Sequence, residues 1–325
     1  MMVTSLMRGV TGWINAHPLV SFVVFFSVFP LWLPSTALAT QILIFGLFAL
    51  GFNLLYGYTG ILSFGHAAYY GLGAYGTGIA LAKLGLGSIW LGLACGLAAA
   101  LVGGVIIGFF CLRRRGIYFA MLTLAFAQLL YFIGFHLADL TGGDDGLRGI
   151  PQLRVGLPGF SVSIESSFAF YYFSFVLVAL AVAGLTRILD SPFGAILRAI
   201  RENSERAAAC GYDISKAKLL SFVFSAMFTG LAGSLDALRL TVVPIESLYW
   251  TTSGQVVIMT LLGGAGTFLG PFVGAAAFLA LEYRLSLITE SWPLVIGVIF
   301  SAFVLFLHKG IWGTLTGGRH GHQSA

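Results

Sequence analysis

The chain has 325 residues, of which 58% are hydrophobic and only 9% are charged, and its formal net charge is +5. A soluble globular domain carries roughly 25% charged residues, so water cannot be the main solvent for this surface. The basic residues gather in short loops between apolar segments, which argues against a nucleic-acid partner and indicates loops on the cytoplasmic side of a membrane.

Long windows without any charge predict the fold class. A bilayer core about 30 Å thick needs about 20 helical residues, and the charge-free windows have that length or multiples of it. The windows are continuously apolar instead of alternating at every second residue, which favours helices over a barrel. The sequence therefore predicts an all-α, polytopic transmembrane helical bundle. The windows lie between Arg8 and Lys83, Lys83 and Arg113, Arg115 and Asp139, Glu165 and Arg187, and Glu246 and Glu282.

In chain order, the first apolar segment, Leu19–Leu33, is followed by Ala37-Leu38-Ala39 and mimics a cleavable signal peptide. We interpret it as a retained first span. The last long segment, 253–286, is interrupted at Gly263–Gly266 and contains either two short spans or a re-entrant piece followed by one span. We expect about ten spans, with nine as the alternative. The expected segments are 14–33, 37–56, 61–82, 88–111, 117–138, 167–187, 217–240, 253–286 and 291–308.

Charge placement predicts the orientation and the organisation of the chain. Arg113–Arg115 and the basic segment 187–218 mark cytoplasmic loops, so the intervening loop 139–166 faces outside. Lys309 and Arg319 favour a cytoplasmic C-terminus. We accordingly divide the chain into an N-terminal segment with the first span (1–36), a membrane core (37–309) that includes the external loop 139–166 and the cytoplasmic segment 191–211, and a cytoplasmic tail (310–325).

Glycines interrupt the apolar pattern at two places that resemble each other. Gly60-Ile-Leu-Ser-Phe-Gly65 and Gly266-Thr-Phe-Leu-Gly270 each precede a helix of small residues, and many transporters are duplicated halves with broken helices at matching places. Glycine is also used simply to let membrane helices pack closely, and both interpretations remain open. The candidate helix-break glycines are Gly57, Gly60, Gly65, Gly263, Gly264, Gly266 and Gly270.

Chemistry-bearing motifs are sparse. The sequence contains no G-x-x-x-x-G-K-[ST] loop, no H-E-x-x-H and no G-x-S-x-G, so we expect no catalytic residue, metal site or cofactor in this chain. An ion-coupled carrier usually keeps ionisable groups in the membrane, and their scarcity here favours a passage driven by a partner. His66 is either a pathway residue or a histidine bonded to a carbonyl left free by the break, and Asp236 with Arg239 predicts a local ion pair. The candidate pathway residues are Asn53, Ser63, His66, Gln128 and Gln255.

Two loops carry polar clusters. The external loop Thr141–Pro151, with four glycines, two acids and an arginine, is either a structural turn or a docking surface for an external partner. The cytoplasmic segment 191–211 predicts one capped amphipathic helix, with Ser191 at the N-cap, Pro192 at the first helical position and Gly211 just past the end. Three oppositely charged pairs lie four residues apart: Arg198/Glu202, Arg201/Glu205 and Glu202/Arg206. A helix that rests on lipid is the alternative to a helix that docks a partner.

Several of these segments resemble one protein family. Glu205-Arg-Ala-Ala-Ala-Cys-Gly211 is similar to the E-A-A-x-x-x-G loop of permeases in ATP-binding-cassette importers, although it departs at the second position and lacks the later I-x-L-P part. Five segments in order, across residues 40–305, resemble the permease subunits of branched-chain amino acid importers. They are Asn53–Ala68, Arg115–Phe126, Thr141–Pro151, Ser191–Gly211 and Leu262–Pro271.

The resemblance implies a multi-pass subunit of a bacterial inner membrane that works with a second permease, two cytoplasmic ATP-binding subunits and a periplasmic substrate-binding protein. It implies import of Leu, Ile or Val, or of similar small zwitterions, with ATP hydrolysis in the partner subunits. The alternative is a passive or gradient-driven channel or carrier for a small polar solute such as urea or an amide. In the importer, the helix 191–211 would couple to an ATPase, burying Ile196, Leu197 and Ile200 in a groove. Its candidate coupling residues are Arg198, Arg201, Glu202, Glu205 and Gly211.

Overall fold

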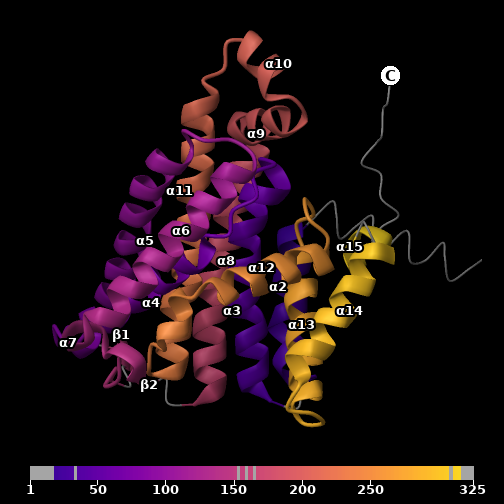
Figure 1. Cartoon of the computed structure of the whole chain (residues 1–325). Helices are drawn as coiled ribbons and strands as arrows, with labels where there is room; N and C mark the ends of the chain where they lie inside the picture. The colour runs from indigo at the N-terminus through magenta and orange to yellow at the C-terminus, as the bar shows by residue number, and fades with distance from the viewer. Residues whose placement is uncertain are drawn as a thin grey trace, which may run out of the picture.

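The computed structural model describes residues 18–32, 35–151, 154–157, 160–163, 166–306 and 310–315. Arg8, which bounds the first charge-free window, and Lys309 and Arg319, which enter the orientation argument, lie outside the described residues. The described part is a helical bundle crossed by long apolar helices (Figure 1). Five of its helices are long and apolar enough to cross a bilayer, so the chain is a polytopic helical membrane protein. These five are α3 with its continuation (Thr36–Tyr58), α5 (Ile89–Cys111), α6 (Ile117–His136), α8 (Ser167–Asp190) and α11 (Ile214–Leu240).

Shorter apolar helices occupy the other expected spans. The expected span 61–82 begins only at His66, because residues 59–65 are not helical, and 253–286 is two helices separated at 264–269. Residues 310–315, expected to begin the tail, form α15, which packs on the α12–α13 pair. The shorter helices are α2 (Pro18–Val28), α4 (His66–Ala82), α12 (Trp250–Gly263), α13 (Gly270–Ser286), α14 (Trp292–Phe306) and α15 (Gly310–Leu315).

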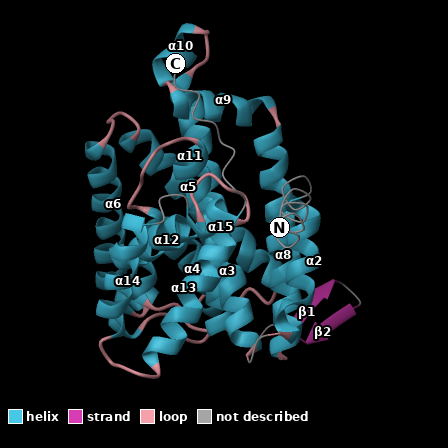
Figure 2. Cartoon of the chain, turned by 90° about the vertical axis from the view of Figure 1, so that its right-hand side faces the viewer, coloured by secondary structure: helices cyan, strands magenta, loops and turns pink. Residues whose placement is uncertain are grey.

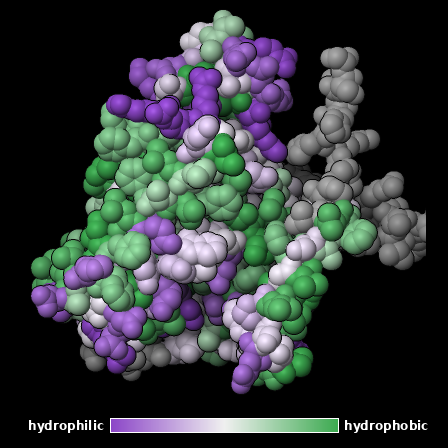
Figure 3. All heavy atoms as spheres, viewed as in Figure 1, coloured by the Kyte–Doolittle hydropathy of each residue, from purple (hydrophilic) through white to green (hydrophobic). Residues whose placement is uncertain are grey.

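The connections gather at two opposite ends of the bundle. Helices α9 (Pro192–Glu202) and α10 (Ser204–Ala209) lie at one end, and α7 (Ala138–Thr141) lies toward the other with the antiparallel hairpin of β1 (Arg154–Leu157) and β2 (Phe160–Ser163) (Figures 1 and 2). On the face shown in Figure 3, hydrophilic residues cover the α9–α10 end, and hydrophobic residues predominate directly below it. The segments predicted to face opposite sides of the membrane therefore lie at opposite ends.

Glycines allow a close helix crossing between α4 and α11. A Cβ added at Gly233 would lie 1.9 Å from the carbonyl oxygen of Tyr70, and one at Gly73 would lie 2.1 Å from the carbonyl oxygen of Gly230. Lipid is as apolar as a leucine side chain, so membrane helices gain by close packing and interhelical hydrogen bonds instead of by hydrophobic burial. The many glycines are thus used, at least here, for packing.

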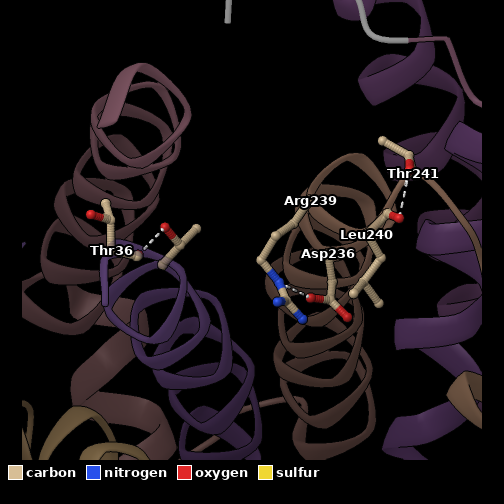
Figure 4. Close-up of polar contacts among 6 residues, drawn as sticks. Thr36, Asp236, Arg239, Leu240 and Thr241 are labelled. Atoms are coloured by element: carbon tan, nitrogen blue, oxygen red, sulfur yellow. Dashed lines mark hydrogen bonds and ion pairs between the residues drawn. The ribbon is translucent and has the colours of Figure 1, made fainter. Parts of the chain in front are cut away.

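The predicted local ion pair is confirmed at the far end of α11 from α9. Arg239 Nε donates to Asp236 Oδ1 at 2.8 Å, and the two side chains are only 19% and 11% exposed (Figure 4). Thr241 follows in the left-handed region with φ of 56° and ends the helix. A buried carboxylate with a guanidinium at this distance is a satisfied pair, which agrees with a structural role.

Candidate transport site and coupling junction

The first glycine break, residues 59–65, is closed by buried side chains of the bundle itself. The hydroxyl of Thr59 donates to the carbonyl of Leu54 at 3.1 Å and lies 2.7 Å from the hydroxyl of Ser221. Thr123 Oγ1 accepts from the backbone N–H of Phe64 at 3.2 Å. Backbone groups that the helix interruption frees are therefore bonded inside the fold, as the absence of water in a membrane requires.

His66 begins α4 directly after this break and is fully buried. Its Nε2 lies 2.9 Å from Ser225 Oγ, and that hydroxyl donates its single proton to the carbonyl of Gly51 at 2.7 Å. Ser225 must therefore accept from His66, which fixes a proton on Nε2. Ser63, also fully buried, accepts from the N–H of Gly65 at 3.2 Å. The structure thus surrounds both predicted pathway residues with helix contacts, and their role in the pathway remains a prediction.

The second glycine break, residues 264–269, is held by one side chain from the end of α3. Asn53 Nδ2 donates to the carbonyl of Thr267 and Asn53 Oδ1 accepts from the N–H of Gly266, both at 2.8 Å. Asn53 is fully buried, so its amide satisfies a donor and an acceptor that no water would reach. Gly264 and Gly266 have φ of 115° and 79°, which side-chain-bearing residues rarely adopt.

Gly57 lets the two breaks approach each other. It lies in a single π-helical turn, Leu54–Tyr58, that continues α3, and such turns are frequent at functional sites. A Cβ at Gly57 would lie 2.1 Å from Asn53 Oδ1 and 2.5 Å from the backbone nitrogen of Gly266. Only glycine leaves room for this three-way contact between segments more than 200 residues apart in the sequence.

Arg201 joins helix α9 to this contact. Its Nη1 donates to the carbonyl of Gly57, and a Cβ at Gly266 would lie 2.8 Å from the same nitrogen. Its aliphatic stem runs past Gly60, where a Cβ would lie 3.1 Å from Cγ. We call the set of Asn53, Gly57, Arg201 and Gly266 the coupling junction. It connects the end of the bundle that carries α9 to both glycine breaks.

The remaining glycines of the predicted set are confined by backbone contacts. A Cβ at Gly65 would lie 2.7 Å from the carbonyl oxygen of Thr123. One at Gly263 would lie 1.8 Å from the carbonyl oxygen of Gly270, so the end of α12 and the start of α13 touch through their main chains.

The single helix expected over 191–211 is wrong, because the chain breaks it at Asn203. Asn203 is extended, with φ of −158° and ψ of 105°, and its Oδ1 accepts from the N–H groups of Glu205 and Arg206 at 3.0 and 2.9 Å. This is an N-cap for α10, and Asn followed by Ser-Glu was the sequence signal for it. Helix α10 ends before Gly211, which has φ of 88°, at the predicted end of the segment.

The contacts of α9 also differ from the prediction. Among the described residues, none of the three predicted pairs forms an ion pair. Arg198 Nη1 instead donates to the carbonyl of Leu189 at 3.1 Å, and Glu202 and Glu205 are exposed. Leu197 and Ile200 are buried within the chain, so they are not available to a partner's groove. The amphipathic spacing was the signal for an apolar face, but it could not tell which surface that face would cover.

The other two pathway candidates are not enclosed as the first three are. Gln128 on α6 and Gln255 on α12 are both half-buried, and Gln128 Oε1 has no hydrogen-bond partner among the described residues. Beside Gln255, a Cβ at Gly254 would meet nothing within 4 Å, and Thr251 is exposed. The structure therefore separates the five candidates into a fully buried group of three and a half-buried group of two, and the side-chain carbonyl oxygen of Gln128 is itself buried.

At the opposite end, the external loop is tied to the segment that leads into α12. Leu147 and Val243 exchange two backbone hydrogen bonds of 2.9 Å, and Gly146 has φ of 70° with its Cα against Val243. Asp144 and Asp145 are exposed on this anchored backbone. The loop is thus a fixed turn that presents charged side chains, a combination that the glycine-rich sequence left open.

The 3₁₀ turn Ile245–Leu248 follows this bridge and inserts between helices. Leu248 is buried where glycines make room, since a Cβ at Gly71 of α4 would lie 2.3 Å from Leu248 Cδ2 and one at Gly134 of α6 would lie 3.0 Å from Leu248 Cδ1. The first turn of α12 is fixed as well, because Ser253 Oγ accepts from the N–H of Ala67 at 2.8 Å. Sequence reasoning missed the insertion of this turn between the helices, because the sequence of residues 245–248 resembles an ordinary polar connection.

At the base of α11, Asp213 anchors the return from α10 into the membrane. Its carboxylate accepts from the N–H of Lys216 at 3.0 Å and pairs with the ammonium of Lys216 at 3.2 Å. The backbone hydrogen bond from Lys216 is the larger cause that lowers the pKa of the Asp213 carboxyl. Within the described residues, no group of three potential metal ligands comes together.

A multi-pass membrane protein with interrupted helices and a helical connector at one end is, by fold and site, a membrane permease. The chain belongs to the branched-chain amino acid transport permease family, because the family described as branched-chain amino acid transport system / permease component matches residues 35–308. It is accordingly a permease component and not a catalytic subunit.

Individual relatives are distant but extend over most of the chain. The chain is 27% identical over 296 residues to the high-affinity branched-chain amino acid transport system permease protein LivM of Salmonella typhimurium, which covers 85% of this chain and 69% of the relative. It is 26% identical over 281 residues to the probable permease LivH of Methanocaldococcus jannaschii, covering 80% and 84%. A guanosine ABC transporter permease, NupQ of Bacillus subtilis, is 29% identical over 126 residues, covering 38% of each chain. No solved structure gives a significant match.

Proposed function

We propose that this chain forms one half of the pore of an ATP-driven importer in a bacterial inner membrane, and that the pore passes Leu, Ile and Val. Its partners are a second permease, two cytoplasmic ATP-binding subunits and a periplasmic binding protein. Among the described residues, ten helices lie at the expected positions, namely α2–α6, α8 and α11–α14, and they support ten spans with both termini in the cytoplasm. The names of the relatives, most of them branched-chain amino acid permeases, support the substrate class.

The observation that carries this proposal is the coupling junction. An importer must convert movement of its ATPases into movement of membrane helices. Arg201 of the connector α9 donates to the carbonyl of Gly57, just before the first break, and lies beside Gly60 of the first break and Gly266 of the second. A helix that merely rests on lipid needs no such bond to the interior. The junction supports a driven passage over a solitary channel.

The proposed mechanism follows from the groups that these hydrogen bonds connect. When an ATPase draws α9, Arg201 carries with it the carbonyl of Gly57 and, through Asn53, residues 266 and 267 between α12 and α13. Residues 265–269 are only half-buried, and the segment 264–269 lacks a helix of its own, so it can change conformation at low cost. Nucleotide binding in the partner then shifts the population between outward-open and inward-open states.

Two half-buried polar residues support a position for the second permease. Gln128 and Gln255 are half-buried polar residues on α6 and α12, and Gln128 Oε1 has no hydrogen-bond partner among the described residues. We therefore assign the pathway to the surface between α6 and α12, closed by the partner subunit. The exposed carboxylates of Asp144 and Asp145 at the other end are assigned to docking of the binding protein.

The test is reconstitution of the four kinds of subunit in vesicles, followed by uptake of radiolabelled leucine. We expect uptake that requires ATP and the binding protein. Leucine or urea flux without ATP and without the partners would contradict the proposal and indicate a passive channel. Single cysteines at Asp144 and Asn203, in a background without native thiols, should react from opposite sides of the membrane; reaction of both from outside would overturn the orientation.

A further inference from the structure

A cavity lies beside the coupling junction, where the end of α8, helix α9 and the second break meet. Its volume is about 160 Å³, close to that of a cavity of about 150 Å³ that holds a benzene ring. It opens to the surface, so a ligand can place an apolar portion inside and a polar portion at the mouth. Its lining combines Leu189, Phe268 and Leu269 with Tyr58, Asp190 and Arg198.

The lining of the cavity contains one positive and one negative side chain, and these two are not paired with each other. Among the described residues, Arg198 and Asp190 form no ion pair with each other or with any other side chain. One nitrogen of Arg198 donates to the carbonyl of Leu189 at 3.1 Å, which leaves its other N–H groups available. The hydroxyl of Tyr58 likewise has no hydrogen-bond partner in the described part of the chain. A cation, an anion and a hydroxyl therefore surround one small opening.

This arrangement matches a small zwitterion with an aliphatic portion. A carboxylate or phosphate would meet Arg198 in a charge-assisted hydrogen bond, about twice as strong as a neutral one, and an ammonium would meet Asp190. The aliphatic portion would lie on Phe268 and Leu269, two residues of the second break. A simple cation, a simple anion or a purely apolar molecule would satisfy only part of the lining.

We propose that this cavity is a cytoplasmic binding site for a small zwitterion and that its occupation slows the transport cycle. The inference rests on the proposed function, because it assigns the cavity to the cytoplasmic side and α9 to coupling. The ligand would touch α8, α9 and residues 268–269 at once and would stabilise the conformation in which these three segments are close. Since coupling requires α9 and the second break to move, a ligand that binds this conformation best opposes the movement.

Two sources supply this chemistry. One is a free branched-chain amino acid that has accumulated in the cytoplasm, in which case the site reports on the product of transport. The other is the headgroup of phosphatidylethanolamine, whose ammonium and phosphate carry the same pair of charges. The experiment separates them.

The test uses the complete importer in vesicles with its ATPases facing the outer medium and substrate-loaded binding protein enclosed. Leucine is added outside in vesicles of phosphatidylglycerol alone, and ATP hydrolysis is expressed as a fraction of the rate without external leucine. We expect saturating leucine to lower this rate at least threefold, while 4-methylpentanoate and leucinol, which each lack one charge, have no effect. Asp190→Asn should abolish at least two thirds of the inhibition, and the same substitution at Asp139, at the other end of the molecule, should not change it.

The other outcomes of this experiment identify the lipid headgroup as the ligand or overturn the inference. If leucine has no effect in phosphatidylglycerol but adding phosphatidylethanolamine lowers hydrolysis in a manner that depends on Asp190, the ligand is the lipid headgroup. If neither leucine nor this lipid changes hydrolysis, or if Asp190→Asn leaves the inhibition intact, the inference is overturned. Hydrolysis that does not respond to loaded binding protein at all would instead overturn the proposed function.

Discussion

The two glycine breaks share a plan but are held in different ways. Each separates a helix that runs toward the α9 end from a helix of 17 residues that begins behind the break, α4 in one case and α13 in the other. The first break is bonded by buried hydroxyls of the bundle, from Thr59, Thr123 and Ser221. The second has one hydroxyl contact of its own, from Thr267 to the carbonyl of Gly264, is bonded to the bundle through the amide of Asn53, and lies within reach of the guanidinium of Arg201.

This difference indicates which break moves. Buried hydroxyl contacts on several helices over-determine the first break, and shifting it would leave several polar groups unsatisfied in a membrane. The second break can shift as a unit with Asn53 and Arg201, because its polar contacts travel with it. We infer that residues 59–65 act as a fixed support and residues 264–269 as the moving part.

The largest effect is expected from Asn53→Leu. The substitution leaves the N–H of Gly266 and the carbonyl of Thr267 without partners, each at a cost of about 1–3 kcal/mol. Because a difference of about 1.4 kcal/mol corresponds to tenfold, we expect leucine uptake to fall by roughly tenfold or more. The matched control is Thr260→Val, which removes a buried hydroxyl of α12 without touching the break; this hydroxyl lies 2.9 Å from the carbonyl of Val256 in its own helix and 3.3 Å from that of Ala49 on α3. Equal losses in the two variants would show that Asn53 acts only in packing.

A somewhat smaller effect is expected from Arg201→Gln. The shortened, neutral side chain cannot reach the carbonyl of Gly57, so loaded binding protein should no longer stimulate ATP hydrolysis although the complex assembles. The control is Arg206→Gln on α10, an exposed arginine whose side chain makes no contact with the breaks. Stimulation that persists at wild-type level in Arg201→Gln would remove this residue from the coupling mechanism.

Next in size is Asn203→Ala, which removes the cap between α9 and α10. Loss of an N-cap costs about 1 kcal/mol, and we expect stimulation of ATP hydrolysis to drop about two- to fivefold as α10 loosens. Asn203→Asp, which keeps an acceptor oxygen for both N–H groups, should restore most of the response. If the aspartate variant is as impaired as the alanine variant, capping is not the cause.

The smallest effect on transport is expected in the first break. Thr59→Val keeps the shape of the side chain but removes the bonds to Leu54 and Ser221, and interhelical hydrogen bonds in membranes are worth about 0.6–1.7 kcal/mol. The Tm of the detergent-purified complex should decrease, while the ratio of stimulated to basal ATP hydrolysis stays unchanged. A reduced ratio with an unchanged Tm would place the moving part in the first break instead.

How much the sequence could predict depended on the kind of signal. Apolar length and charge-free windows placed the long helices well, because the bilayer imposes that length on any helix that crosses it. The break at Asn203 was missed although its capping signal is local, since the amphipathic spacing around it suggested one continuous helix. The pairing of Arg201 with Gly57 and of Asn53 with Gly266 could not be predicted, because it joins segments 144 and 213 residues apart and competes with equally plausible helical pairs four residues apart.

The central claim is that Arg201 and Asn53 act in one connection from α9 to the second break, and a double-mutant cycle tests it most directly. The quantity is the ratio of ATP hydrolysis with and without loaded binding protein, measured in Arg201→Gln, Asn53→Ala and the double variant. Residues that act through one connection are not additive, whereas independent sites are additive within about 0.5 kcal/mol. We predict that the double variant is no more impaired than the worse single variant. Fold losses that multiply in the double variant would contradict a single connection and would assign the two residues to separate functions.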